Sequence, residues 1–150
     1  MKIDYFQVSE IKVSYTDKVK ASERAKICAS KDAANILNTV FEDCMQHHEE
    51  FYVMLLNRSN SVLGISCISK GGISGTVVDV KIILQTALKT NSTGLIICHN
   101  HPRGNLAASR EDIKITEKLK NACQLLDLSL LDHLIVTDEG YLSFADEGIL

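Results

Sequence analysis

Residues 95–112 have the sequence LIICHNHPRGNLAASRED, and the predicted fold is built outward from them. The first four residues are apolar, which predicts a buried strand. Because alternate side chains of a strand point to the same side, His99 and His101 can converge on one ion. Pro102, the only proline of the chain, cannot continue a strand ladder. The stretch therefore predicts a strand that ends in two histidines on one face.

A helix is predicted to follow this loop. Ser109 is a favourable N-cap, and Asp112 falls in the first turn. Two imidazoles and one carboxylate would give a tetrahedral zinc ion three ligands and leave one position for water, as in catalytic sites. Simpler interpretations exist, since His-x-His pairs are common and Ser-x-x-Asp is a capping box on its own account. The combination is more specific than either part.

The pattern His-x-His-Pro, six residues, then Ser-x-x-Asp resembles the motif of the JAMM metalloproteins, also called JAB or MPN+. The fuller string, His-Asn-His-Pro-x-Gly with Ser-Arg-Glu-Asp, is similar to the bacterial RadC branch. The resemblance implies that His99, His101 and Asp112 bind Zn²⁺ and that Ser109 acts as a catalytic residue that positions reacting groups. Arg103 replaces the serine that RadC proteins usually carry after the proline, and it is not a predicted ligand.

The same resemblance indicates a general base. RadC proteins carry a pattern like Glu-x-Phe-x-x-x-x-x-Asn, which Glu49, Phe51 and Asn57 match. We therefore predict Glu49 as the catalytic base, with Glu50 as the fallback. Without the downstream motif, a solvated acidic pair at a helix end would be the preferred interpretation.

Two further pairs contain histidine. Asp132 and His133 also match the family's pattern, at the start of a late strand, and we interpret them as hydrogen-bonding partners of the ligands. His47 and His48 are rival metal ligands in principle. They are predicted instead to lie on the exposed end of a helix.

Composition limits the class of protein. A chain of 150 residues with 45% apolar and 23% charged residues suits one globular domain over residues 1–150, with the resemblance clearest over 30–150. A net charge of −3 disfavours DNA as the partner. No apolar run is long enough to span a membrane, and five cysteines without a Cys-x-x-Cys favour reduced thiols in the cytoplasm.

Hydrophobic periodicity predicts an α/β domain, a mixed β-sheet flanked by helices. The predicted helices are 31–47 with Ser30 as N-cap, one capped by Asp79, and about 109–127 with Ile115, Leu119, Ala122 and Leu126 on its inner face. The predicted strands, besides the one before His99, are one or two within 3–15, then 51–56, 62–69, 76–78, 128–136 and 141–145.

The resemblance implies two hypotheses for function. The first is a zinc hydrolase that cleaves a peptide or isopeptide amide, in which Glu49 activates water and Ser109 donates to the oxyanion. The second is a non-enzymatic or nuclease-associated accessory in DNA repair or mobile-element maintenance. RadC proteins carry an N-terminal helix-hairpin-helix region for DNA, and this sequence is expected to represent the catalytic domain without it. The complete ligand set favours the hydrolase and leaves its peptide or protein substrate unknown.

Overall fold

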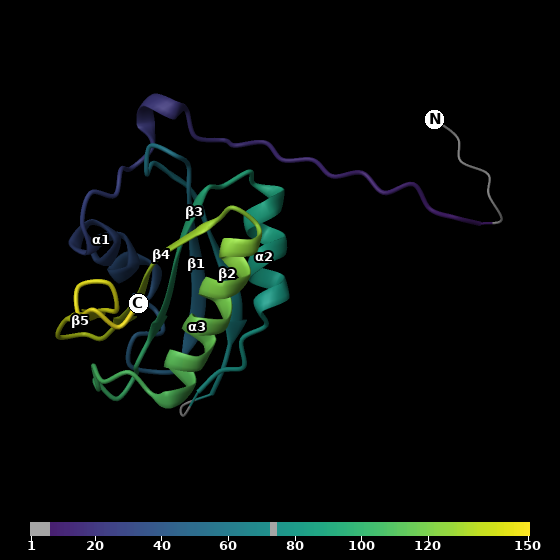
Figure 1. Cartoon of the computed structure of the whole chain (residues 1–150). Helices are drawn as coiled ribbons and strands as arrows, with labels where there is room; N and C mark the ends of the chain where they lie inside the picture. The colour runs from purple at the N-terminus through teal and green to yellow at the C-terminus, as the bar shows by residue number, and fades with distance from the viewer. Residues whose placement is uncertain (1–6, 73–74) are drawn as a thin grey trace.

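The computed structural model describes residues 7–72 and 75–150, and these residues are organised around a five-stranded sheet (Figure 1). The strand order is β2-β1-β3-β4-β5. β1 runs antiparallel to both β2 and β3, β3 runs parallel to β4, and β5 closes the sheet antiparallel to β4. The bounds are β1 Glu50–Leu56, β2 Val62–Lys70, β3 Gly94–Asn100, β4 Ser129–Val136 and β5 Tyr141–Ser143. The predicted α/β class with a mixed sheet is confirmed.

Helices cover both faces of the sheet. α1 (Ser30–Val40) lies on one face, whereas α2 (Val80–Lys89) and α3 (Arg110–Leu125) lie on the other (Figure 1). A short 3₁₀ helix, η1 (Ala21–Glu23), precedes α1. Leu37 of α1 packs with Ile96 of β3, while the next residue of that strand, Ile97, packs with Ile83 and Leu119. β3 is therefore buried on both faces, which explains its uninterrupted apolar run.

The helices that flank the histidine strand begin at the predicted caps. The Asp79 carboxylate accepts a hydrogen bond from the Lys81 amide at 2.9 Å at the start of α2. At the start of α3, the Ser109 hydroxyl oxygen accepts from the Asp112 amide at 3.0 Å, and the Asp112 carboxylate accepts from the Ser109 amide at 2.8 Å. This reciprocal capping box satisfies two amides that the helix itself cannot pair.

α1 begins differently from the prediction. Ser30 is its first helical residue, and the N-cap position belongs to Ala29. Asp32 takes over the capping role, because its carboxylate accepts hydrogen bonds from the amides of Cys28 and Ala29 at 2.8 and 2.9 Å. The Ser30 hydroxyl instead bonds to Asp146, near the end of the chain. The acidic residue in the first turn therefore caps more effectively than the serine that precedes it.

α1 also ends earlier than predicted, at Val40 rather than near residue 47. Residues 41–47 form successive turns. The backbone bonds from Glu42 to Thr39 and from Cys44 to Phe41 join residues three apart, so the regular helical pattern is lost after Val40. The apolar periodicity in this stretch is genuine, since Phe41 and Cys44 are buried, but it continues through turns and not through a helix.

Two predicted strands do not form in the described part of the chain. Residues 7–15 join no sheet and lead away from it as the purple segment of Figure 1, with Ile11 and Val13 exposed. The rest of that prediction, residues 3–6, lies outside the described residues. Residues 76–78 are not a strand, because the only pairing beside them is an isolated bridge between Gly72 and Gly75. A strand pattern needs a neighbouring edge to become a strand, and sequence alone does not supply one.

Three of the four residues predicted for the inner face of α3 pack against the core, namely Ile115, Leu119 and Ala122, whereas Leu126 does not. Leu119 is fully buried as predicted, but Leu126 lies beyond the helix and is exposed, while Cys123 is fully buried. Helical spacing of four residues from Leu119 leads to Cys123, so the thiol and not the leucine faces the core. Among the described residues, no helix is long and apolar enough to cross a membrane.

A pair of leucines on α3 tests this packing. Leu119→Ala should lower the free energy of unfolding by about 2–5 kcal/mol, because it leaves a cavity in the core. Leu125→Ala on the same helix should change it by less than about 0.5 kcal/mol, because Leu125 is 87% exposed. Urea unfolding midpoints with unchanged slopes measure both values, and equal losses in the two variants would contradict the packing.

Candidate metal centre

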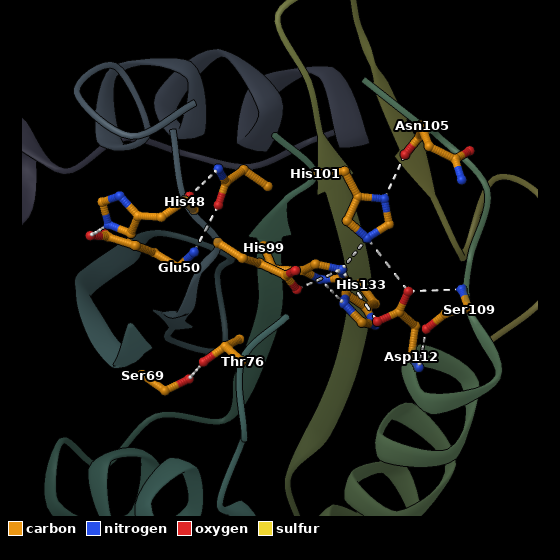
Figure 2. A network of polar contacts seen from close by, with 12 residues as sticks. His48, Glu50, Ser69, Thr76, His99, His101, Asn105, Ser109, Asp112 and His133 are labelled. Carbon is orange, nitrogen blue, oxygen red and sulfur yellow. Dashed lines mark hydrogen bonds and ion pairs between the residues drawn. The ribbon is translucent and has the colours of Figure 1, made fainter. Parts of the chain in front are cut away.

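The carboxyl end of β3 presents two histidines beside the start of α3. The Nε2 atoms of His99 and His101 are 2.9 Å apart. Asp112 adds its carboxylate from the first turn of α3, with Oδ1 3.3 Å from His99 Nε2 and Oδ2 3.7 Å from His101 Nε2. Figure 2 shows the three side chains converging. The structure thus brings together all three residues that the sequence predicted as ligands.

Glu49 reaches the same cluster from the residue that precedes β1. β1 pairs with β3 in a register that puts Phe51 opposite His99, and their rings are stacked with centroids 5.8 Å apart. Glu49 lies two residues before Phe51 and on the same side, so its Oε1 lies 3.9 Å from His99 Nε2. Glu49, His99 and His101 form a group whose potential ligand atoms all lie within 4.8 Å of one another.

Glu50, the fallback base, points to the opposite face of the sheet. Its carboxylate contacts His48 Nε2 at 2.8 Å and the Tyr52 hydroxyl at 2.7 Å. Consecutive residues of an extended segment face opposite ways, so only one of the two glutamates can meet His99. The structure places Glu49 in that position. His48 is therefore half-buried against Glu50, contrary to the prediction of an exposed helix end, whereas His47 is exposed.

A chain of hydrogen bonds fixes the tautomer of His99. The Thr116 hydroxyl donates its single hydrogen to the Asp112 carbonyl oxygen at 2.6 Å, so it must accept at its other contact, His133 Nδ1, also at 2.6 Å. Nδ1 of His133 therefore carries the proton, and Nε2 is an acceptor. His99 Nδ1, 2.9 Å away, donates to it. His99 is left with a free lone pair on Nε2, directed at the cluster.

The tautomer of His101 is fixed in the same sense. Its Nδ1 donates to the Asn105 carbonyl oxygen, which frees the lone pair on Nε2 (Figure 2). Two lone pairs 2.9 Å apart, with the Asp112 carboxylate beside them, repel each other unless a positive charge lies between them. A proton can supply that charge, and so can a divalent ion. Such outer hydrogen bonds are what orient histidine ligands in metal proteins, so the donor set fits a metal such as zinc.

Burial and charge shape the ionisation of the cluster. Burial, with the neighbouring His99, holds the pKa of His133 well below its usual range, in keeping with a neutral ring. Burial alone would raise the pKa of Asp112, but a proton on His99 in the metal-free cluster, together with the hydrogen bonds from Ser109, outweighs burial and leaves the pKa well below its ordinary value. Burial raises the pKa of Glu49, while His99 and His101 oppose the rise. Asp112 therefore stays ionised more firmly than Glu49.

Ser109 stands at the open side of the cluster. It is exposed, and its hydroxyl oxygen accepts the Asp112 amide in the capping box. That bond uses an oxygen lone pair and leaves the hydroxyl hydrogen available. The structure gives Ser109 this capping contact with a predicted ligand, and its role toward a bound group stays a prediction.

The two predicted partners on β4 separate. His133 faces α3 and supports His99, as described above. Asp132 faces the other way: its carboxylate accepts from the Ser143 hydroxyl and from the Ala145 amide at 3.0 Å. Asp132 is buried and supports β5 and the turn after it, so the structure does not bring it to the metal cluster. Strand alternation allows only one of two neighbours to face the ligands.

Two residues of the site were missed by sequence reasoning. Thr116 lies four residues after Asp112, one helical turn further along the same face, and that spacing was the available signal. Asn100 stands between the two histidines, and strand alternation directs its side chain to the α1 face. A polar residue on the buried face of a strand needs partners, which was the second signal.

Asn100 finds those partners in the turn between α1 and β1. Its side chain is fully buried and accepts from the Glu50 amide at 2.8 Å. Its amide group donates to the carbonyl oxygens of Cys44, Met45 and His48 at 3.2, 3.2 and 2.9 Å. The turn that carries Glu49 is thereby held against the strand that carries the histidines.

A cleft of about 360 Å³ opens beside the cluster. Glu49 and Asp112 line its polar part, and Val77, Val78 and Ile115 contribute apolar surface. The cleft is thus apolar along one part and acidic along the part lined by Glu49, Glu111 and Asp112. This arrangement suits an elongated ligand with a polar group held at the cluster.

The mixed sheet between helices and the two histidines with a carboxylate define the class: a JAB-type domain with a candidate metal site. Residues 27–149 match the family described as the RadC-like JAB domain, so the chain belongs to that family.

Three relatives illustrate the similarity. The chain is 49% identical over 124 residues to a UPF0758 protein of Flavobacterium johnsoniae, an alignment that covers 83% of this chain and 53% of the relative. UPF0758 proteins of Porphyromonas gingivalis and Staphylococcus haemolyticus are 39% and 36% identical, each over 85% of this chain and over 56% and 55% of the relative. The chain therefore spans about half the length of the curated relatives that it matches.

Removing the Asn100 side chain should destabilise the fold. Asn100→Ala leaves the buried Glu50 amide and the carbonyl groups of Met45 and His48 without this partner, so we expect a loss of at least about 2 kcal/mol in the free energy of unfolding. Asn121→Ala, on the exposed side of α3, is the control and should cost nothing, since alanine favours helix. Chemical denaturation compares the two variants with wild type. An Asn100→Ala variant as stable as wild type would show that these hydrogen bonds do not hold the turn against β3.

Proposed function

We propose that this protein is a zinc-dependent hydrolase of JAMM type that cleaves a peptide or isopeptide amide. One observation carries the proposal: the Nε2 atoms of His99 and His101 lie 2.9 Å apart beside the Asp112 carboxylate, and a second carboxylate, Glu49, lines the adjoining cleft. Two histidines and one carboxylate leave a fourth zinc position open, which separates catalytic from structural sites. RadC-like JAB membership agrees with such a centre.

Each residue has a proposed task. His99, His101 and Asp112 would hold zinc, which, when bound, supplies a Lewis acid that polarises the amide carbonyl and makes water easier to deprotonate. Glu49 takes a proton from the attacking water and passes it to the departing amine. Burial raises the pKa of Glu49, which makes it a better proton acceptor than an exposed glutamate.

Ser109 and the cleft serve the substrate in this proposal. The free hydroxyl hydrogen of Ser109 donates to the carbonyl oxygen as negative charge develops there. The apolar surface around Val77, Val78 and Ile115 accommodates side chains next to the cleaved bond. The substrate is proposed to be a peptide or protein, and DNA is disfavoured by the net charge of −3.

The same proposal assigns the protein to the cytoplasm. All five cysteines are free, two of them exposed, which suits a reducing compartment. Cys44, Cys98 and Cys123 are buried, whereas Cys28 and Cys67 are exposed.

Metal analysis tests the proposed ligands. The His99→Ala/His101→Ala double variant should lose one zinc equivalent per chain relative to wild type, measured by elemental analysis after purification without added metal. Asp112→Asn should bind zinc more weakly, because it removes the anionic ligand. His47→Ala, at an exposed position, is the control and should keep the wild-type content of this centre. An unchanged zinc content in the double variant would refute the assignment.

The role of Glu49 is tested by exchanging each glutamate for glutamine. Glu49→Gln should retain zinc but lose about 10²–10⁴-fold in turnover, because an amide cannot accept the proton. Glu50→Gln should lose less than about tenfold, because Glu50 lies on the other face of the sheet. Turnover is followed with fluorogenic peptide amides and lysine-branched isopeptides on the zinc-loaded chain. The reverse ranking would transfer the role to Glu50, and loss of zinc in Glu49→Gln would make Glu49 a ligand.

A further inference from the structure

A second group of potential metal ligands lies on the α1 face of the sheet. Cys44 and His48 belong to the turns after α1, and Glu50 is the first residue of β1. Their potential ligand atoms all lie within 4.8 Å of one another, and Cys44 and Glu50 are buried. Figure 2 shows the His48–Glu50 pair apart from His99, His101 and Asp112. This group is therefore separate from the proposed catalytic centre.

The donor set suits zinc. Thiolate, imidazole and carboxylate are its three common protein ligands, and thiolate disfavours magnesium and calcium. With zinc–ligand bonds of about 2.0–2.3 Å, tetrahedral ligand atoms stand roughly 3.5 Å apart. His48 Nε2 and Glu50 Oε1 are already 2.8 Å apart, so side-chain shifts of the order of 1 Å admit an ion.

The backbone around this group is ordered in advance. Asn100 accepts from the Glu50 amide and donates to the carbonyl oxygens of Cys44 and His48, so one buried side chain holds the backbone of all three residues. A site of this kind loses little backbone freedom on binding, which favours affinity.

The surroundings also support a bound cation. The Tyr52 hydroxyl donates to Glu50 Oε2 at 2.7 Å and orients the carboxylate, as outer partners do in metal sites. Lys70 Nζ, 3.4 Å from Glu50 Oε1, now supplies positive charge there, but its side chain is 67% exposed and can move into solvent. His48 Nδ1 lies 2.8 Å from His47 Nδ1. The ring proton of His48 can therefore sit on Nδ1 and point at His47, which leaves the lone pair of His48 Nε2 free to bind a metal ion.

We propose that Cys44, His48 and Glu50 form a second zinc site. Binding releases the thiol proton of Cys44 to water and displaces Lys70 from Glu50. The site would pin the turn that carries Glu49 and Glu50, on the far side of the sheet from the His99–His101 pair.

Cobalt titration of the full chain separates the two sites, because only the second contains sulfur. Metal-free protein titrated with Co²⁺ should develop a thiolate-to-cobalt charge-transfer absorption in the near ultraviolet. The band should persist in His99→Ala/His101→Ala, which lacks the catalytic ligands, and should vanish in Cys44→Ser. Cys28→Ser and Cys67→Ser, at the two exposed cysteines, are matched controls and should keep it. No band in wild type, or a band that survives Cys44→Ser or disappears with Cys67→Ser, overturns the proposal.

A second variant guards against loss of the fold, since Cys44 is buried. His48→Ala changes a half-buried position and should remain folded, as judged by circular dichroism. The Co²⁺ affinity measured from the charge-transfer band should fall at least about tenfold in this variant. Zinc analysis should give about two equivalents in wild type and about one in His48→Ala. Unchanged affinity in His48→Ala refutes the site. If the zinc equivalent assigned to His99 and His101 were absent while the cobalt band depended on Cys44 and His48 as expected, the proposed catalytic centre would fail and the second site would stand. The failure of one site can therefore be told from the failure of the other.

Discussion

Four backbone groups of the turn between α1 and β1 are held by the buried side chain of Asn100, and the candidate site depends on this clamp. The turn leads into Glu49, whereas Asn100 sits between the two histidines of β3. One set of hydrogen bonds therefore couples the proposed base to the proposed ligands.

Strand alternation distributes the polar residues between two faces. On β3, His99 and His101 face α3 while Asn100 faces α1. At the start of β1, Glu49 and Glu50 divide in the same way, so two adjacent carboxylates enter different clusters. The proposed catalytic and second zinc sites are thus consequences of one geometric rule applied to two neighbouring antiparallel strands.

Local patterns predicted much of the fold and the candidate ligands. The caps at Asp79 and Ser109 form as expected because a cap bond joins residues two or three apart in sequence. His99, His101 and Asp112 lie within one strand–loop–helix unit, so their spacing implies their proximity. Two failed predictions depended on distant partners: residues 76–78 found no neighbouring strand, and Asp132 turned toward β5. The others failed locally: the N-cap of α1 is Ala29 and not Ser30, α1 ends at Val40, and Leu126 lies beyond α3.

The sequence by itself determined the α/β class, the capped helices and the histidine pair at a strand end, because each follows from contacts between residues close in the chain. Only the tertiary structure decided which glutamate meets the histidines, since that choice depends on the register between β1 and β3, strands more than 40 residues apart. It also decided the tautomer of His99. That proton position is set by Thr116 and His133, which come from a helix and a strand that fold onto the site from further along the chain.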